Sequence, residues 1–134
     1  MEPIGYWLNR TDQALTAAMN ALLADCGLTR LAWQVLNVVE DAPRSTDEAV
    51  RTVLAANAGT EALTTTIEAL LSGGWMMRTE PGRLALTDEG HARLTDVGLR
   101  VGDFRERSIA GISPEEYRAA VSVLERMTRN VEQA

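Results

Sequence analysis

The segment ALTTTIEALLSGGWMMRTEPGRLALTDEG, residues 62–90, decides the fold that we expect for this chain. Its first part predicts a helix, because large aliphatic residues recur at the spacing that places them on one helical face. These residues are Leu63, Ile67, Leu70 and Leu71. Gly73 and Gly74 follow, and glycine tolerates the positive φ with which many helices end.

The second part of the segment predicts a small β-hairpin and the start of another helix. Residues 75–78 and 83–86 favour two short strands around a turn at Pro81 and Gly82. Thr87 is then suited to be the N-cap of a helix whose first turn contains the acidic residues Asp88 and Glu89. Helix, hairpin and helix in this order are typical of a winged helix.

In these motifs the chain resembles the MarR family of bacterial transcription regulators. The matching residues are Leu28–Thr29 with Trp33, Val35 and Leu36; Leu70–Gly74 with Arg78; Leu86–Gly90; and Ile112–Glu116. They occur in the family's order and cover nearly the whole chain. The resemblance implies a mainly α fold with a small β-hairpin wing, in which a winged helix-turn-helix is combined with N- and C-terminal dimerisation helices.

The same resemblance implies the domain organisation. We expect a single domain over 1–134, with the winged helix-turn-helix lobe at 28–90 and dimerisation helices at 1–27 and 91–134. In the family these terminal helices interlock two subunits, so we expect a homodimer. A two-fold dimer would place two recognition helices about one DNA turn apart on a pseudo-palindromic site.

The residues before the segment predict further helices with defined starts. Apolar spacing predicts a long helix from Ile4 to about Ala24, and Thr29 can cap the next one, which ends before Pro43. Ser45 and Glu48 have capping-box spacing. We expect the helix that they begin to turn an apolar face inward, formed by Ala49, Val50, Val53 and Leu54. Thr60 is expected to cap the recognition helix.

The residues after the segment predict two more helices. The first runs from Asp88 to about Ser108 and contains glycines at 90, 98 and 102, which suggest close backbone approach, a bend or a weak helix. Ser113 and Pro114 open the second helix with a capping box and proline at its first position. Both helices carry apolar stripes that the small lobe is not expected to cover.

Composition limits the classes of protein to consider. The 134 residues and 46% hydrophobic content suit one core. We expect a cytoplasmic protein with no membrane segment, since no apolar run approaches about 20 residues and no basic-then-apolar leader is evident. The net charge is −6, and residues 28–90 hold five arginines against nine acids, or −4. This acidity is unusual for a protein that grips DNA phosphates.

Seven residues are the predicted DNA contacts. On the recognition helix, threonine hydroxyls and methyls can meet phosphates or bases, although no arginine, lysine, asparagine or glutamine stands there. Family members often have a long polar side chain at the position of Thr65. The wing is shorter than in the family and lacks its Asp-x-Arg motif. The predicted contacts are Thr60, Thr64, Thr65, Arg44, Arg51, Arg78 and Arg83, and solvated surface positions are the alternative.

Trp7 and Trp33 are the predicted ligand-binding residues. In the family, small phenolic or lipophilic effectors bind between the dimerisation helices and the DNA-binding lobe, and aromatic side chains suit such pockets. Core packing is the alternative for both residues, and it is favoured for Trp75.

Other chemistry is not supported. Cys26 is the only cysteine and His91 the only histidine, so we predict no metal site, no cofactor and no catalytic triad. Redox sensing by Cys26 is a minor alternative. The expected function is a DNA-binding transcriptional regulator, a repressor by family habit, bound to double-stranded DNA and released by a small aromatic or lipophilic ligand. The alternative is a protein-interaction or ligand-binding module of the same fold that has lost DNA binding.

Overall fold

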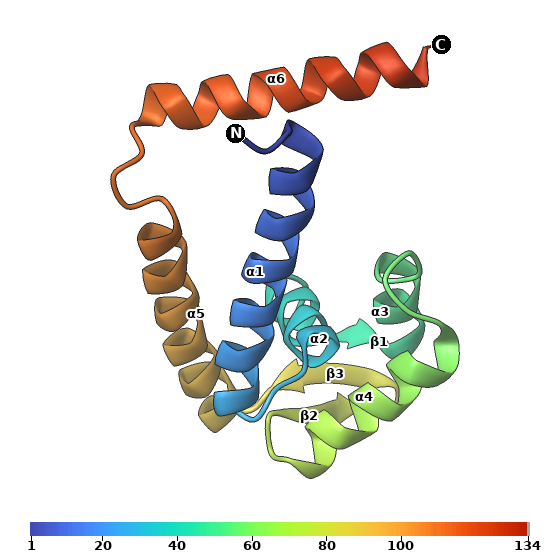
Figure 1. Ribbon diagram of the computed structural model, residues 1–134. Helices are drawn as coiled ribbons and strands as arrows, with labels where there is room; N and C mark the ends of the chain where they lie inside the picture. The colour runs from blue at the N-terminus through green and yellow to red at the C-terminus, as the bar shows by residue number, and fades with distance from the viewer. Residues whose placement is uncertain (134) are drawn as a thin grey trace. The chain divides into compact units, whose positions relative to one another are not determined.

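A computed structural model describes residues 1–133. In chain order the elements are α1 (Ile4–Asp25), α2 (Arg30–Asp41), β1 (Ser45–Thr46), α3 (Asp47–Val53), α4 (Thr60–Ser72), β2 (Met76–Glu80), β3 (Arg83–Leu86), α5 (Asp88–Ser108) and α6 (Pro114–Glu132) (Figure 1). The predicted mainly α fold with a β wing is confirmed. The pair α3 and α4 forms the helix-turn-helix, and β2 and β3 form the wing.

The sheet has a third strand that the sequence does not predict. β1 pairs antiparallel with β3, giving the order β1-β3-β2, with Ser45 opposite Leu84. This pairing corrects the predicted capping box. Ser45 lies in the strand and donates its hydroxyl to the Ala42 carbonyl, while Thr46 is the N-cap of α3 and accepts from the Ala49 amide at 3.0 Å. The capping box of Ser45 with Glu48 is therefore wrong.

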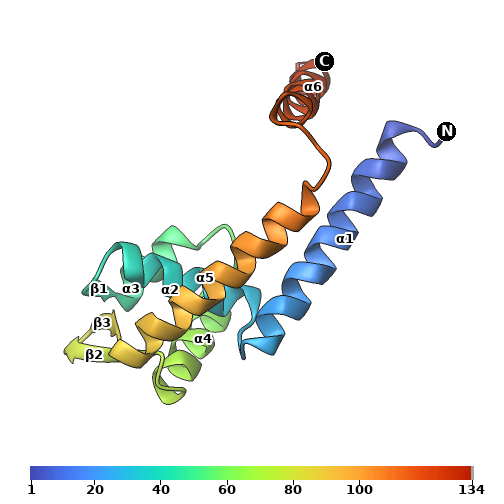
Figure 2. The same ribbon diagram turned by 90° about the vertical axis from the view of Figure 1, so that its left-hand side faces the viewer.

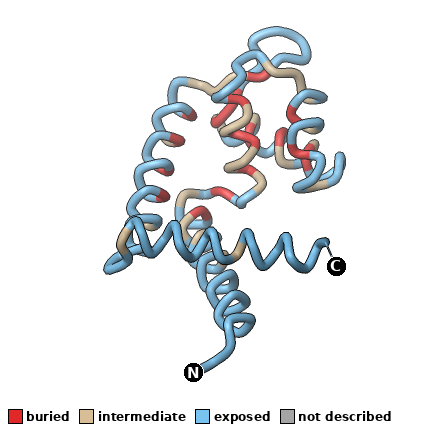
Figure 3. Tube along the Cα trace, turned by 90° about the horizontal axis from the view of Figure 1, so that it is seen from above, coloured by how far each residue is buried: buried red, intermediate tan, exposed pale blue. Residues whose placement is uncertain are grey.

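The core combines buried residues of α2, α3, α4 and the sheet with Leu23 of α1 and a stripe on α5, and the red in Figure 3 is spread over these parts. Its fully buried large side chains are Leu23, Val35, Leu36, Val39, Val50, Leu63, Ile67, Met76 and Leu84. The stripe predicted on the recognition helix faces this core, as expected. Trp75 is 4% exposed, so its predicted core position is confirmed. The inward face of α3 is narrower than predicted, because Ala49 and Val53 are exposed.

Strand β3 leads directly into α5 (Figure 2), and the backbone at this junction is in close contact with the start of the wing. Thr87 caps α5 as predicted: its hydroxyl accepts from the Gly90 amide at 2.8 Å and donates to the Gly74 carbonyl at 2.6 Å. Gly90 lies against the Trp75 backbone, which confirms a close approach at that glycine. Around Gly98 and Gly102, a Cβ would meet nothing within 4 Å, so close packing within the chain does not explain these two glycines.

The chain divides into two compact units, Met1–Val101 and a second that starts at Gly102. In the first, α1 buries only Leu23 and leaves the apolar side chains of its first half exposed. In the second, α6 has the predicted capping box of Ser113 with Glu116 but no buried residue. Within residues 1–133, no helix combines the length and the apolar character that crossing a bilayer requires.

Candidate nucleic-acid interface

The exposed face of α4 is the first part of the candidate interface. Gly59 is the N-cap of this helix and no side chain caps it, so Thr60 is its first residue and the predicted cap at Thr60 is wrong. Thr60 and Thr65 are exposed, whereas Thr64 is partly covered. Thr66 uses its hydroxyl within the helix, donating to the Ala62 carbonyl at 2.8 Å. The helix offers hydroxyls and carboxylates to a partner, and no cationic side chain.

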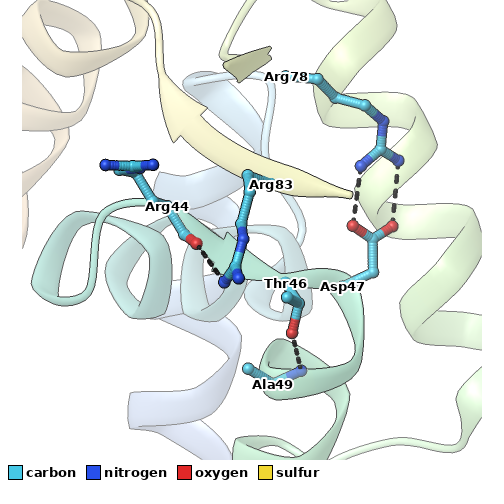
Figure 4. A network of polar contacts seen from close by, with 6 residues as sticks. All are labelled: Arg44, Thr46, Asp47, Ala49, Arg78 and Arg83. Atoms are coloured by element: carbon cyan, nitrogen blue, oxygen red, sulfur yellow. Dashed lines mark hydrogen bonds and ion pairs between the residues drawn. The ribbon is translucent and has the colours of Figure 1, made fainter. Parts of the chain in front are cut away.

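The wing arginine Arg78 is paired within the chain. Its two terminal nitrogens donate to the two carboxylate oxygens of Asp47 at 2.8 and 3.1 Å, so the start of α3 is joined to β2 (Figure 4). The hydrogen bond from Arg78 lowers the pKa of Asp47, and the same bond raises the pKa of Arg78. To neutralise a phosphate, the Arg78 guanidinium must either leave the Asp47 carboxylate or bind the carboxylate and the phosphate together.

Arg44 and Arg83 are also engaged within the chain. Arg44 has φ of +70°, the left-handed conformation that residues other than glycine rarely adopt, and its guanidinium pairs with Glu80 on β2. Arg83 donates to the Arg44 carbonyl at 3.2 Å (Figure 4). The amide of Arg44 donates to the Leu84 carbonyl at 2.9 Å. Strand β3 and Glu80 thus hold the loop between α2 and β1 in this strained conformation.

Arg51 differs from the other three arginines. It lies in the last turn of α3 and has no ion pair within residues 1–133, although its charge contributes to lowering the pKa of Asp47. The structure therefore places Arg44, Arg78 and Arg83 around the wing and the start of α3, with Arg51 one α3 turn away from Asp47. Sequence spacing gave no signal for these pairings, because Asp47 and Arg78 are 31 positions apart.

The two predicted ligand-binding tryptophans lie in different environments. Trp33 is partly buried and packs against the core, but Trp7 is 50% exposed and contacts Tyr6 edge-on at 5.1 Å between ring centroids. The alternative interpretation, that Trp7 packs in the core, is therefore wrong for the residues that the structure describes. Its position in α1 is about 24 Å along the helix from Leu23, at 1.5 Å per residue.

A recess that the sequence did not reveal lies elsewhere. It has a volume of about 150 Å³ and is lined by Asp25, Cys26, Trp75, Arg93, Asp96, Val97 and Arg100. Arg93 stacks on the Trp75 ring at 3.8 Å, and a terminal nitrogen of Arg100 lies 3.8 Å from the Cys26 sulfur. His91 is outside this recess, with its Nδ1 3.4 Å from a carboxylate oxygen of Glu40.

Comparison with solved structures identifies the fold. A MarR family protein of Mycobacterium tuberculosis, crystallised with DNA, superposes with a TM-score of 0.74 at 24% sequence identity, covering 95% of this chain and 98% of that one. The reduced form of MarR from E. coli gives 0.73 at 23% identity, covering 95% and 94%. The repressor CouR, bound to p-coumaroyl-CoA, gives 0.72 at 24% identity, covering 95% and 92%.

These similarities extend over nearly the full length of the chain, terminal helices included. The protein therefore has the fold of the MarR family transcription regulators, with the winged helix-turn-helix and the terminal helices that the sequence resemblance implied. No protein-family model and no curated protein sequence matches the chain.

Proposed function

We propose that this protein is a DNA-binding transcriptional regulator, and specifically a repressor, that binds a pseudo-palindromic duplex site as a homodimer. The observation that carries the proposal is the superposition on a chain crystallised with DNA, which covers 95% of this protein. The element that would enter the major groove is α4, the second helix of the helix-turn-helix. A regulator of this kind acts in the cytoplasm, where bacterial DNA lies.

The exposed apolar residues of the terminal helices support the homodimer. On α6 the apolar side chains recur at helical spacing, yet none of them is buried; they are Tyr117, Val121, Leu124, Met127 and Val131. On α1, Ile4, Trp7 and Leu8 are each at least 41% exposed. Apolar surface of this extent favours a partner, and a second copy of the chain would also bring two α4 helices to one DNA duplex.

A small aromatic or lipophilic ligand is the proposed signal for release. The solved complex of CouR with p-coumaroyl-CoA supports this for a protein of the same fold. Trp7 and Trp33 are the proposed ligand contacts, with Trp7 becoming covered when the dimer forms. A ligand that binds better to a dimer with misaligned α4 helices would draw the population away from the DNA-competent form.

Binding to the protein's own promoter region at low salt tests the proposal. An electrophoretic shift should appear there, and size-exclusion chromatography with light scattering should give a dimer. Changing Thr64 and Thr65 together to alanine should weaken the specific complex, because the hydroxyls and methyls that face the groove are removed. An unchanged affinity for the operator would remove both threonines from the interface.

A second function is favoured by the acidity of the lobe. Arg44 and Arg78 are each paired with a carboxylate of the same chain, and the exposed face of α4 carries Glu61 and Glu68. A module that has lost DNA binding, and pairs instead with a protein or a small molecule, would have these features. If the protein still dimerises but retards no DNA at low salt, this second function is established and the DNA-binding function is excluded.

A further inference from the structure

The recognition helix has an unusual set of groups on its exposed face. A helix that reads guanine normally uses arginine or lysine, and one that reads adenine uses asparagine or glutamine. None of these four residue types occurs in α4, which spans Thr60–Ser72. Its exposed polar side chains are Thr60, Glu61, Thr65, Glu68 and Ser72. The strongest acceptors on this face are therefore two carboxylates.

Glu61 is the better placed of the two carboxylates for reading a base. It lies in the first turn of α4, and residues near the N-terminus of a recognition helix contact base edges. With Gly59, Ala62, Thr65 and Thr66 it lines a shallow hollow in the surface. Glu61 has no ion pair in the part of the chain that the structure describes, so no cation of the lobe competes for its oxygens.

Glu68 has a different environment. It lies two helical turns after Glu61, and its charge contributes to raising the pKa of Arg78, so it is close enough to the wing to interact with that guanidinium. A carboxylate whose charge is attracted by a cation is less available to a base. The two glutamates are therefore not equivalent, although both are exposed.

The chemistry of the major groove limits what Glu61 can accept. A carboxylate only accepts hydrogen bonds, and the donors in the groove are the amino groups of cytosine and adenine. Adenine presents its N7 acceptor beside the amino group, whereas cytosine presents only the donor. Guanine presents two acceptors, O6 and N7, which would repel a carboxylate.

We infer that Glu61 is a specificity-determining residue that accepts a hydrogen bond from the amino group of a cytosine in each half-site. This inference rests on the proposed DNA-binding function and specifies how that site reads sequence. Glu61 then favours one base pair and also opposes the others, because an unpaired carboxylate among acceptors and phosphates weakens every wrong complex. The same unpaired carboxylate lowers the affinity of the protein for DNA of other sequences.

Selection of binding sites from a pool of randomised duplexes tests the inference. The unaltered protein is compared with Glu61→Gln, Glu61→Ala and the control Glu89→Gln. Glu89 is also exposed, in the first turn of α5, so its substitution makes the same change in charge at an equivalent helical position. Circular dichroism and chromatography confirm that each variant folds and dimerises like the unaltered protein.

The expected result is a C·G pair at one position of each half-site. Replacing that pair should weaken binding of the unaltered protein about 10-fold or more. This loss is within the range found when one base pair of a specific site is mismatched. Glu61→Ala should lose the preference at that position alone. Glu61→Gln should shift it to A·T, since an amide pairs with adenine. Glu89→Gln should keep the original preference.

Two other results would overturn the inference. The first would leave the proposed DNA-binding function intact, and the second would exclude it. A motif that is selected by the unaltered protein and unchanged in both Glu61 variants would exclude base reading by Glu61 and leave DNA binding intact. If the unaltered protein enriches no sequence at low salt, the proposed function fails as well.

Discussion

Gly90, in the first turn of α5, lies directly against the backbone of Trp75 at the start of the wing. A Cβ added to Gly90 would be 2.8 Å from the Trp75 carbonyl carbon and 2.9 Å from its Cα. Real Cβ atoms do not approach backbone that closely, so any side chain would push α5 and the wing apart. The same carbonyl accepts from the Thr87 amide at 3.1 Å, so a displacement would also stretch this hydrogen bond.

Gly90→Ala should therefore destabilise the protein. Overpacking against rigid backbone costs about 1–3 kcal/mol, which exceeds the gain of about 1 kcal/mol in helix propensity. Urea unfolding followed by circular dichroism measures the difference. Gly98→Ala is the matched control, because a Cβ there meets nothing within 4 Å and the substitution should leave stability unchanged or raise it. Equal effects of the two substitutions would contradict the packing argument.

Thr87→Val should cost about 1–2 kcal/mol of unfolding free energy, the range for losing an N-cap together with a partly buried hydrogen bond. The shape and β-branching of the side chain are kept, so the loss reports on the hydroxyl that joins Gly74 to Gly90. Thr60→Val is the comparison, because the Thr60 hydroxyl does not cap α4. Thermal or urea unfolding should show the larger loss for Thr87→Val.

The ion pair of Asp47 with Arg78 should make stability depend on pH. Its hydrogen bond to Arg78 lowers the folded-state pKa of Asp47 below the ordinary value of 3.8, so the contribution to stability is present above that value and is lost as pH falls through the folded pKa. Since both side chains are partly exposed, the contribution should be about 1 kcal/mol or less.

Asp47→Asn should accordingly be less stable than the unaltered protein at pH 7, and the difference should shrink below about pH 3.8. Urea unfolding at several pH values measures it. Glu48→Gln, at the next position of the same helix and exposed, is the control and should show no such pH dependence of its effect. A stability difference for Asp47→Asn that stays constant from pH 7 to strongly acidic pH would contradict the assignment.

If the protein binds DNA as proposed, Arg51 should neutralise a phosphate more readily than Arg44 or Arg78, because it has no carboxylate partner within residues 1–133. Arg51→Ala should weaken binding to all duplexes similarly and reduce the slope of log K against log salt by about 0.9 for each phosphate that is no longer neutralised. Fluorescence anisotropy at several salt concentrations measures this.

Arg126→Ala, an exposed position on α6, removes the same charge outside the helix-turn-helix and the wing and is the control. It should leave the slope unchanged. If Arg126→Ala reduced the slope as much as Arg51→Ala does, the effect would come from the net charge of the protein, and a phosphate contact of Arg51 would be excluded.

Much of the fold could be predicted because its signals are local. Leu63, Ile67 and Leu70 are spaced for one helical face, and that face is buried. Thr29 caps α2 by accepting from the Ala32 amide at 3.1 Å, and Ser113 closes its capping box with Glu116. In these cases the residues that make the interaction are within one or two turns of each other, so the sequence alone contains both partners.

The remaining features depend on partners that are distant in sequence. The two-residue strand β1 exists because β3 supplies its hydrogen bonds, and this pairing moves the cap of α3 from Ser45 to Thr46. The internal partners of Arg44 and Arg78, and the contact of Gly90 with Trp75, arise in the same way. Local periodicity determined the helices, the wing and their order. Only the tertiary structure decided which charges are paired, because a carboxylate and a guanidinium 31 positions apart meet only after the core has packed.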